Sequence, residues 1–132
     1  MAVTARKRPG LYQASCTLTD QVGDLVYITS AANGFYKVKR CNPASYAMMP
    51  AWGVIVQKYS TTKCTVQTQG EVRNIYTGLI PNKTYSVSSS GRPTFPAQFP
   101  LGGFVMHQIV GVAIDTGVLY LRPADPTRLA AG

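Results

Sequence analysis

Five acidic side chains and a single histidine are the groups of this sequence that could transfer protons in a reaction. They are Asp20, Asp24, Glu71, Asp115, Asp125 and His107. Catalysis requires titratable groups that converge on one site, and a glycosidase requires a pair of carboxyls. Four of the five acids lie in or beside predicted turns or tails, where Asp usually forms a turn or a cap, and no two are spaced as a general acid and base. We therefore predict that the protein is not an enzyme.

The three cysteines, Cys16, Cys41 and Cys64, are odd in number and too widely spaced for a disulfide framework or a metal-binding CxxC pair. His107 cannot complete a zinc site alone, and a mixed site with the cysteines is the alternative. Gly102-Gly103 lacks the following helix and the Lys-Ser or Lys-Thr pair of a phosphate-binding loop. We expect the cysteines to be small buried residues of a protein that folds in a reducing cytoplasm, with no metal and no cofactor.

The net charge is +8, yet only 14% of the residues are charged, against about 25% in typical soluble domains. This low content is typical of a subunit packed into a larger assembly, and a polar β-protein that works alone is the alternative. Apart from the run Arg6-Lys7-Arg8 the basic residues are scattered, whereas nucleic-acid-binding proteins usually gather them on one face. We expect an acidic protein partner and no nucleic acid. No apolar stretch approaches the roughly 20 residues of a membrane helix, so we expect no membrane partner.

Alternating apolar and polar residues dominate the chain, with turn residues about every eight to twelve positions. This pattern predicts an all-β fold with a single small antiparallel β-barrel or β-sandwich domain over residues 12–122. An extended N-terminal arm, 1–11, and a C-terminal arm, 123–132, should flank it. Strands are expected at 12–18, 24–29, 35–40, 52–59, 63–68, 71–76, 84–88, 106–115 and 118–122.

Turn residues predict how these strands are joined. Asn33-Gly34 and Thr116-Gly117 should close hairpins, and Gln69-Gly70 should mark a bulge. The proline-rich segment 92–103 should be an ordered loop, because proline cannot donate to a strand ladder. The helix candidates are short, at 43–49 and 126–131.

Three segments have a composition that fits contact with another subunit: the arm 1–11, the loop 92–103 and the tail 123–132. Segments that cannot pack on their own domain commonly become ordered on a partner, and frayed termini are the alternative for the arms. The predicted contact residues are Arg6, Lys7, Arg8, Pro9, Tyr12, Phe95, Phe99, Arg122 and Arg128. Aromatic residues inside the predicted strands should pack in the core or between subunits; they are Tyr27, Phe35, Tyr36, Trp52, Tyr59, Tyr76, Tyr85 and Tyr120.

A series of short motifs follows one another over about residues 20–122. They are Val22-Gly23-Asp24-Leu25-Val26-Tyr27, Pro50-Ala51-Trp52-Gly53-Val54-Ile55, Val66-Gln67-Thr68-Gln69-Gly70-Glu71-Val72, Gly78-Leu79-Ile80-Pro81-Asn82-Lys83-Thr84-Tyr85-Ser86-Val87, Gly91-Arg92-Pro93 and Ile109-Val110-Gly111-Val112-Ala113-Ile114-Asp115. In this order they resemble the small β-domain of tailed-bacteriophage structural proteins, in particular the head decoration, or cement, proteins. Asn82 stands where that family often has Gly, a change that a turn tolerates. The related domain also occurs in tail fibres and spikes.

This resemblance implies a homotrimer on the outside of an icosahedral capsid, bound to the major capsid protein where capsomers meet. It implies a protein of the virion, assembled in the host cytoplasm, that stabilises capsomer contacts and has no catalytic site. One alternative is a phage tail, fibre or baseplate module that contacts the host or other tail proteins. Another is a basic β-barrel that binds nucleic acid.

We expect the basic arm to cross onto a neighbouring capsid or decoration subunit, because residues 6–10 cannot contribute to a core. Deletion of residues 1–10 should therefore lower the number of copies bound per head and the temperature at which the particle breaks. Protein staining of purified particles and a thermal melt measure both quantities. If neither changes, the arm is not a contact.

Overall fold

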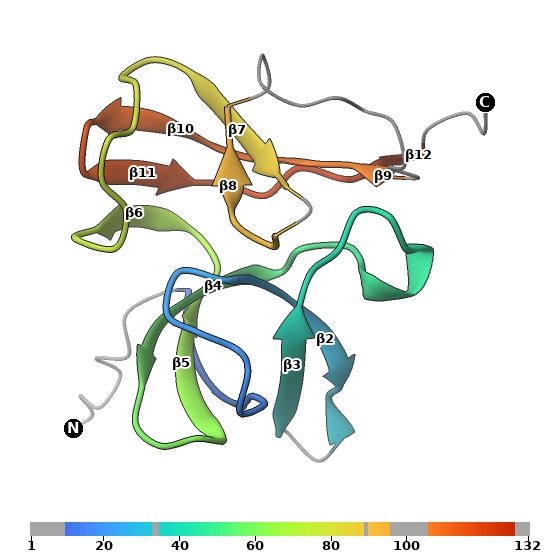
Figure 1. Cartoon of the computed structure of the whole chain (residues 1–132). Helices are drawn as coiled ribbons and strands as arrows, with labels where there is room; N and C mark the ends of the chain where they lie inside the picture. The colour runs from blue at the N-terminus through green and yellow to red at the C-terminus, as the bar shows by residue number, and fades with distance from the viewer. Residues whose placement is uncertain (1–9, 33–34, 89, 96–105, 129–132) are drawn as a thin grey trace, which may run out of the picture.

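A computed structural model describes residues 10–32, 35–88, 90–95 and 106–128. Nearly all regular structure in these ranges is β-strand, arranged as a small closed barrel with a second sheet stacked against it (Figure 1). The prediction of an all-β fold is therefore confirmed. A single turn of 3-10 helix, η3 (Tyr46–Met48), lies within the first helix candidate.

The barrel is a closed ring of five strands in the order β1-β3-β2-β4-β5. Its strands are β1 (Leu11–Ser15), β2 (Leu25–Ser30), β3 (Tyr36–Arg40), β4 (Gly53–Lys58) and β5 (Lys63–Gln67). Four neighbouring pairs are antiparallel, including the predicted β2–β3 hairpin, and the β1–β3 pair is parallel. A ring with an odd number of strands cannot alternate direction all the way round, so one parallel pair is a geometric requirement of this closure.

The second sheet has the order β6-β11-β10-β7-β8. A separate two-stranded ladder, β12-β9, is formed by the segments that come before β10 and after β11 in the sequence. The strands of the second sheet are β6 (Gly70–Arg73), β7 (Thr84–Val87), β8 (Pro93–Thr94), β10 (Ile109–Asp115) and β11 (Val118–Leu121). The small ladder pairs β9 (Met106–His107) with β12 (Thr127–Arg128). The predicted hairpin around Thr116-Gly117 is confirmed as β10–β11.

Two hydrophobic clusters hold these parts together. One fills the barrel and consists of Cys16, Val26, Val38, Ile55, Cys64 and Val66. The larger one lies between the barrel and the second sheet, with Leu25 and Val54 from the barrel and Val110, Leu119 and Leu121 among its members from the sheet. Consecutive residues of β2 and β4 therefore enter different clusters, which explains why both strands are apolar on both faces.

Three local predictions differ from the structure. Gly70 is not a bulge but the first residue of β6, where the chain leaves the barrel with a φ of 91° that glycine adopts readily. Pro93–Thr94, expected in a loop, form the edge strand β8, a position that tolerates proline because its missing N–H faces no partner. Thr127–Arg128, placed in the C-terminal arm and in a helix candidate, pair with β9.

Gly111 generates a test of the sheet geometry. A Cβ at this position would lie 2.3 Å from the Tyr120 carbonyl oxygen, whereas one at Gly117 would have its nearest neighbour at 3.8 Å. Gly111→Ala should lower the free energy of unfolding by about 1–3 kcal/mol, as overpacking does. Gly117→Ala is the matched control and should change it by no more than about 0.5 kcal/mol. Urea denaturation of both variants measures the difference, and equal effects would contradict the close approach of β10 and β11.

Candidate binding groove and contact surfaces

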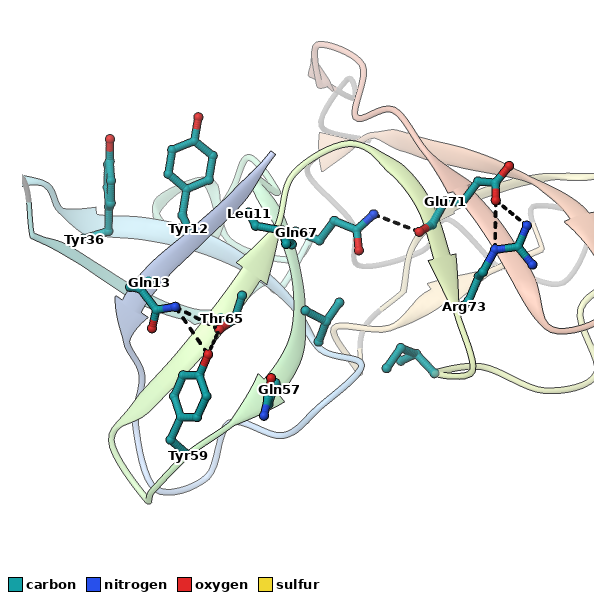
Figure 2. A pocket seen from close by; sticks show the side chains of 12 residues that line it. Leu11, Tyr12, Gln13, Tyr36, Gln57, Tyr59, Thr65, Gln67, Glu71 and Arg73 are labelled. Atoms are coloured by element: carbon teal, nitrogen blue, oxygen red, sulfur yellow. Dashed lines mark hydrogen bonds and ion pairs between the residues drawn. The ribbon is translucent and has the colours of Figure 1, made fainter. Parts of the chain in front are cut away.

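A groove of about 680 Å³ lies where the barrel meets β6 (Figure 2). Side chains from β1, β3, β4 and β5 and from Tyr59, just after β4, line one side of it, and side chains from β6 and the segment that follows line the other. The lining residues are Leu11, Tyr12, Gln13, Tyr36, Val56, Gln57, Tyr59, Thr65, Gln67, Glu71, Arg73 and Ile75. The groove therefore exists only because the chain turns from β5 into β6 at Gly70.

Strand register places three polar side chains of the groove in one row. Thr65 of β5 is paired with Gln13 of β1 on one side and with Gln57 of β4 on the other. Residues paired across neighbouring strands project to the same face. Two carboxamides thus flank one hydroxyl on the outer surface of the barrel.

Hydrogen bonds order part of this row. The Gln13 Nε2 donates to the Tyr59 hydroxyl and to Thr65 Oγ1, both at 3.3 Å. The hydroxyls of Tyr59 and Thr65 also share a short hydrogen bond. The hydrogen bonds of Thr65 and then Gln13 lower the pKa of Tyr59. The phenol is therefore held in place although its ring is exposed.

The far side of the groove is ordered by Gln67 and an ion pair. The Gln67 Nε2 donates to the carbonyl oxygens of Gln69 and Glu71, each at 2.9 Å. The Arg73 Nε donates to Glu71 Oε1 at 2.9 Å, and a second N–H of the guanidinium reaches the same oxygen. The cation and the anion of the groove therefore neutralise each other.

An aromatic cluster of Tyr12, Tyr36 and Trp52 borders the groove on the opposite face of β1 from Gln13. The Tyr12 and Tyr36 rings meet edge to face with centroids 5.6 Å apart, and Trp52 lies 5.1 Å from Tyr12 and 5.0 Å from Tyr36. Trp52 also packs against the barrel cluster. Figure 2 shows the two tyrosine rings projecting from the barrel with their hydroxyls outermost.

The predicted contact residues have different environments. Tyr12 belongs to the aromatic cluster, and Arg122 is exposed beside a second, shallower hollow that Trp52 also lines. Phe95 packs on its own chain, 6.2 Å from the Tyr85 ring and with Lys83 Nζ 5.8 Å from its centroid. The Arg128 guanidinium lies 4.5 Å from the centroid of the Tyr46 ring. The remaining predicted residues, Arg6, Lys7, Arg8, Pro9 and Phe99, lie outside the described residues.

Several strand aromatics are on the surface and not in a core. Phe35, Tyr59 and Tyr120 are exposed by 75%, 54% and 45%. Tyr120 belongs to an apolar stripe on the outer face of the second sheet, which consists of Ile109, Val112, Ile114 and Tyr120. In the sequence, segment 109–115 is apolar on both faces of the strand, and this pattern indicates an apolar outer face. A strand that is buried on both faces has the same pattern, so the sequence does not distinguish the two cases.

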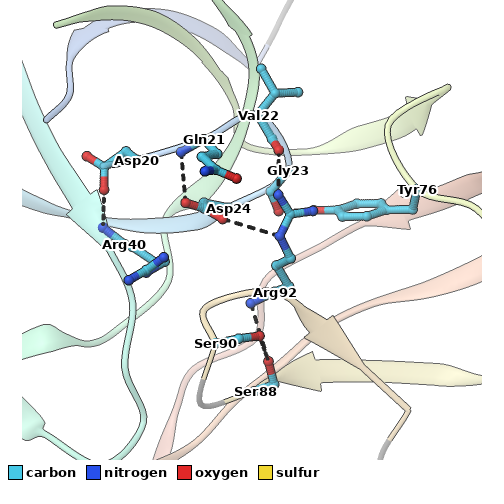
Figure 3. A network of polar contacts seen from close by, with 10 residues as sticks. All are labelled: Asp20, Gln21, Val22, Gly23, Asp24, Arg40, Tyr76, Ser88, Ser90 and Arg92. Carbon is cyan, nitrogen blue, oxygen red and sulfur yellow. Dashed lines mark hydrogen bonds and ion pairs between the residues drawn. The ribbon is translucent and has the colours of Figure 1, made fainter. Parts of the chain in front are cut away.

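A buried carboxylate joins the barrel to the second sheet (Figure 3). Asp24 Oδ2 accepts the Gln21 N–H at 2.9 Å, and Oδ1 lies 3.4 Å from the Arg92 Nε. The Arg92 Nη2 donates to the Val22 carbonyl at 2.8 Å, and the Tyr76 hydroxyl donates to the Gly23 carbonyl at 2.6 Å. Two side chains from the second-sheet half thus bind the loop before β2. We call this group the Asp24 cluster.

The charge of Asp24 is costly where it lies. Its side chain is 2% exposed, and burial raises the pKa of the carboxyl above its ordinary value of 3.8, against the opposing effects of the Gln21 hydrogen bond and the Arg92 charge. Asp20 is also buried and accepts N–H groups from Thr17 and Arg40. Both acids therefore have the turn-forming role that the sequence predicts.

Gln108 makes a second connection between the halves. Its buried carboxamide accepts the Ala51 N–H at 2.7 Å and donates to the carbonyls of Ala51 at 3.1 Å and Ala124 at 2.8 Å. Ala51 precedes β4 and Ala124 follows β11, so one side chain ties the barrel, the second sheet and the C-terminal tail together. It also interrupts the strand predicted at 106–115, which divides into β9 and β10.

Within the described ranges, no three His, Cys, Asp or Glu side chains are grouped to hold a metal ion. The same residues contain no helix long and apolar enough to cross a membrane. Comparison of the chain with protein-family models, with curated proteins and with solved structures finds no match in any of the three.

The buried Asp24 carboxylate predicts a pH-dependent contribution to stability. A raised pKa means that the folded state holds the proton more tightly than the unfolded state, so this group's contribution falls as pH rises above 3.8. Asp24→Asn removes the titration. The unfolding free energy of the wild type minus that of the variant should therefore decrease between pH 3 and pH 7, as measured by urea denaturation at both values. A difference that grows with pH would mean that Arg92 stabilises the charge more than burial destabilises it.

Proposed function

We propose that this chain is a structural protein of a bacteriophage virion, which decorates the outer surface of an icosahedral head and stabilises contacts between capsomers. Its partners are then the major capsid protein and further copies of itself. The order of strand motifs that resembles head decoration proteins supports this proposal. The all-β fold supports it as well, because it exposes an apolar stripe on the second sheet and, in the described ranges, a set of unpaired cations.

The apolar stripe is the observation that carries the proposal. Ile109, Val112, Ile114 and Tyr120 are each between 38% and 47% exposed. Val112 lies directly opposite Tyr120 on the neighbouring strand, so their side chains form one surface. Contiguous exposed apolar surface commonly marks a protein contact, and burial stabilises it by about 25 cal/mol per Å².

The distribution of charge supports an acidic protein as the partner. Two of the five acids, Asp20 and Asp24, are buried, and Glu71 is paired with Arg73. Exposed cations without an ion pair in the described part of the chain include Lys37, Lys39, Lys63, Lys83 and Arg122. The surface is therefore more uniformly positive than the sequence suggests, and attraction to it should weaken as salt rises.

A charge placed within the stripe tests the proposal. Val112→Asp should weaken binding to heads that lack the protein by about tenfold or more, because the carboxylate must be desolvated in the contact. Thr61→Asp makes the same change of charge in the exposed turn between β4 and β5 and should leave binding unchanged. Co-sedimentation with heads measures both, after circular dichroism has shown that each variant is folded.

Equal binding of the two variants would exclude the stripe as the contact. The number of copies per particle, measured by quantitative mass spectrometry, separates head decoration from a tail module. A decoration protein is present in hundreds of copies and a tail module in a handful, so a count of a few copies would overturn the proposed location.

A further inference from the structure

We propose that the groove between the barrel and β6 binds a neutral oligosaccharide. This site lies between the barrel and β6, borders the apolar stripe where Glu71 pairs with Tyr120, and goes beyond the structural role proposed above. The inference depends on four properties of the groove: its polar side chains, its exposed Tyr59 ring, its lack of net charge and its closed strands.

The polar side chains of the groove are neutral and retain hydrogen-bonding capacity. In the described part of the chain, the carboxamide of Gln57 has no hydrogen-bond partner, and the Oε1 atoms of Gln13 and Gln67 accept none. A carboxamide offers two donors and one accepting oxygen. Sugar hydroxyls both donate and accept, so these three side chains match them without requiring a charge on the ligand.

The ring of Tyr59, which is 54% exposed, supplies an apolar surface beside these amides. A sugar ring presents its C–H groups on its faces and its hydroxyls at its edge, so it can lie against an aromatic ring while its hydroxyls reach polar groups. The Tyr59 hydroxyl shares a short hydrogen bond with Thr65 and accepts a hydrogen bond from the Gln13 Nε2 at 3.3 Å, so the ring is fixed beside the polar row. Rings fixed in this way lose little conformational freedom on binding.

The electrostatics of the groove favour a neutral ligand. The protein has a net charge of +8, but the groove contains one cation and one anion, Arg73 and Glu71, which are paired with each other. Nucleic acids and sulfated glycans require unpaired Lys or Arg side chains along their path. Among the described residues, the unpaired cations therefore do not line the groove.

The strand arrangement disfavours an extended peptide. Peptides that bind β-proteins commonly add a strand to an exposed edge, but β1, β4 and β5 belong to a closed ring and have neighbours on both sides. The edge of β6 is also partly occupied, because Gln67 Nε2 donates to the Glu71 carbonyl. A volume of about 680 Å³ is within the range of small-ligand sites, about 300–1,000 Å³.

Nuclear magnetic resonance on the full ¹⁵N-labelled chain tests the proposal. Maltohexaose, cellohexaose, chitohexaose and a mannohexaose are titrated separately, and heparin hexasaccharide and a six-nucleotide oligo-dT serve as anionic probes. At least one neutral hexasaccharide should shift the side-chain amide signals of Gln13, Gln57 and Gln67 together, and this shift should persist in 0.5 M NaCl. If no neutral probe shifts them, or if only the anionic probes do and salt abolishes the effect, the proposal is wrong.

Variants locate the bound sugar and separate this proposal from the proposed function. Gln57→Ala should weaken binding about tenfold without loss of stability, because its side chain is exposed. The exposed Gln21 provides the matched control, and Gln21→Ala should bind as the wild type does. Gln57→Ala should still bind heads, whereas Val112→Asp should still bind sugar. If Gln57→Ala and Gln21→Ala bind the sugar equally, the ligand lies elsewhere.

Discussion

Strands β2 and β4 separate two hydrophobic clusters, and the arrangement of the whole molecule depends on this double burial. Leu25 and Val54 face the layer between the barrel and the second sheet, while Val26 and Ile55 face the barrel interior. All four are completely buried. Neither half could be removed without exposing the larger cluster to water, so the barrel and the sheet form one folding unit with no linker between them.

Buried polar groups determine how the two halves are aligned. Hydrophobic burial is non-directional and would tolerate a rotation of one layer over the other. The Asp24 cluster and the carboxamide of Gln108 do not tolerate it, because a buried polar atom that loses its partner costs about 1–3 kcal/mol. Arg92 and Gln108 act at different places along the interface, and together they oppose such a rotation.

The molecule has two surfaces of different chemistry. The apolar stripe on the second sheet is suited to a protein contact that excludes water, whereas the groove presents neutral hydrogen-bonding groups beside the Tyr59 ring. Residues of the stripe and residues of the groove are separate except that Tyr120 and Glu71 are paired across β11 and β6. The stripe therefore borders the groove at this pair, while Gln13, Gln57 and Thr65 lie on the barrel.

The sequence by itself determined most of the longer strands. Alternation with a period of two predicted strands at nearly the observed positions and the two hairpins, because neighbouring side chains on a strand point to opposite faces. It also determined that Asp20 and Asp24 form turns. Period-two alternation assigns residues to faces but does not say what each face meets. The Ile-Val-Gly-Val-Ala-Ile run of β10 therefore looked the same as a buried strand, although Val112 and Ile114 are exposed.

Only the tertiary structure decided which surfaces became sites. Tyr12, Gln57 and Glu71 come from three strands that are far apart in the chain, and they meet because a five-stranded ring closed with one parallel pair and because the chain left it at Gly70. Their convergence on one groove depends on that closure, whereas the pairing of Glu71 with Arg73 is local to β6. Long-range pairing is set by the total burial of two clusters and by a few buried hydrogen bonds, and no local pattern of residues contains that information.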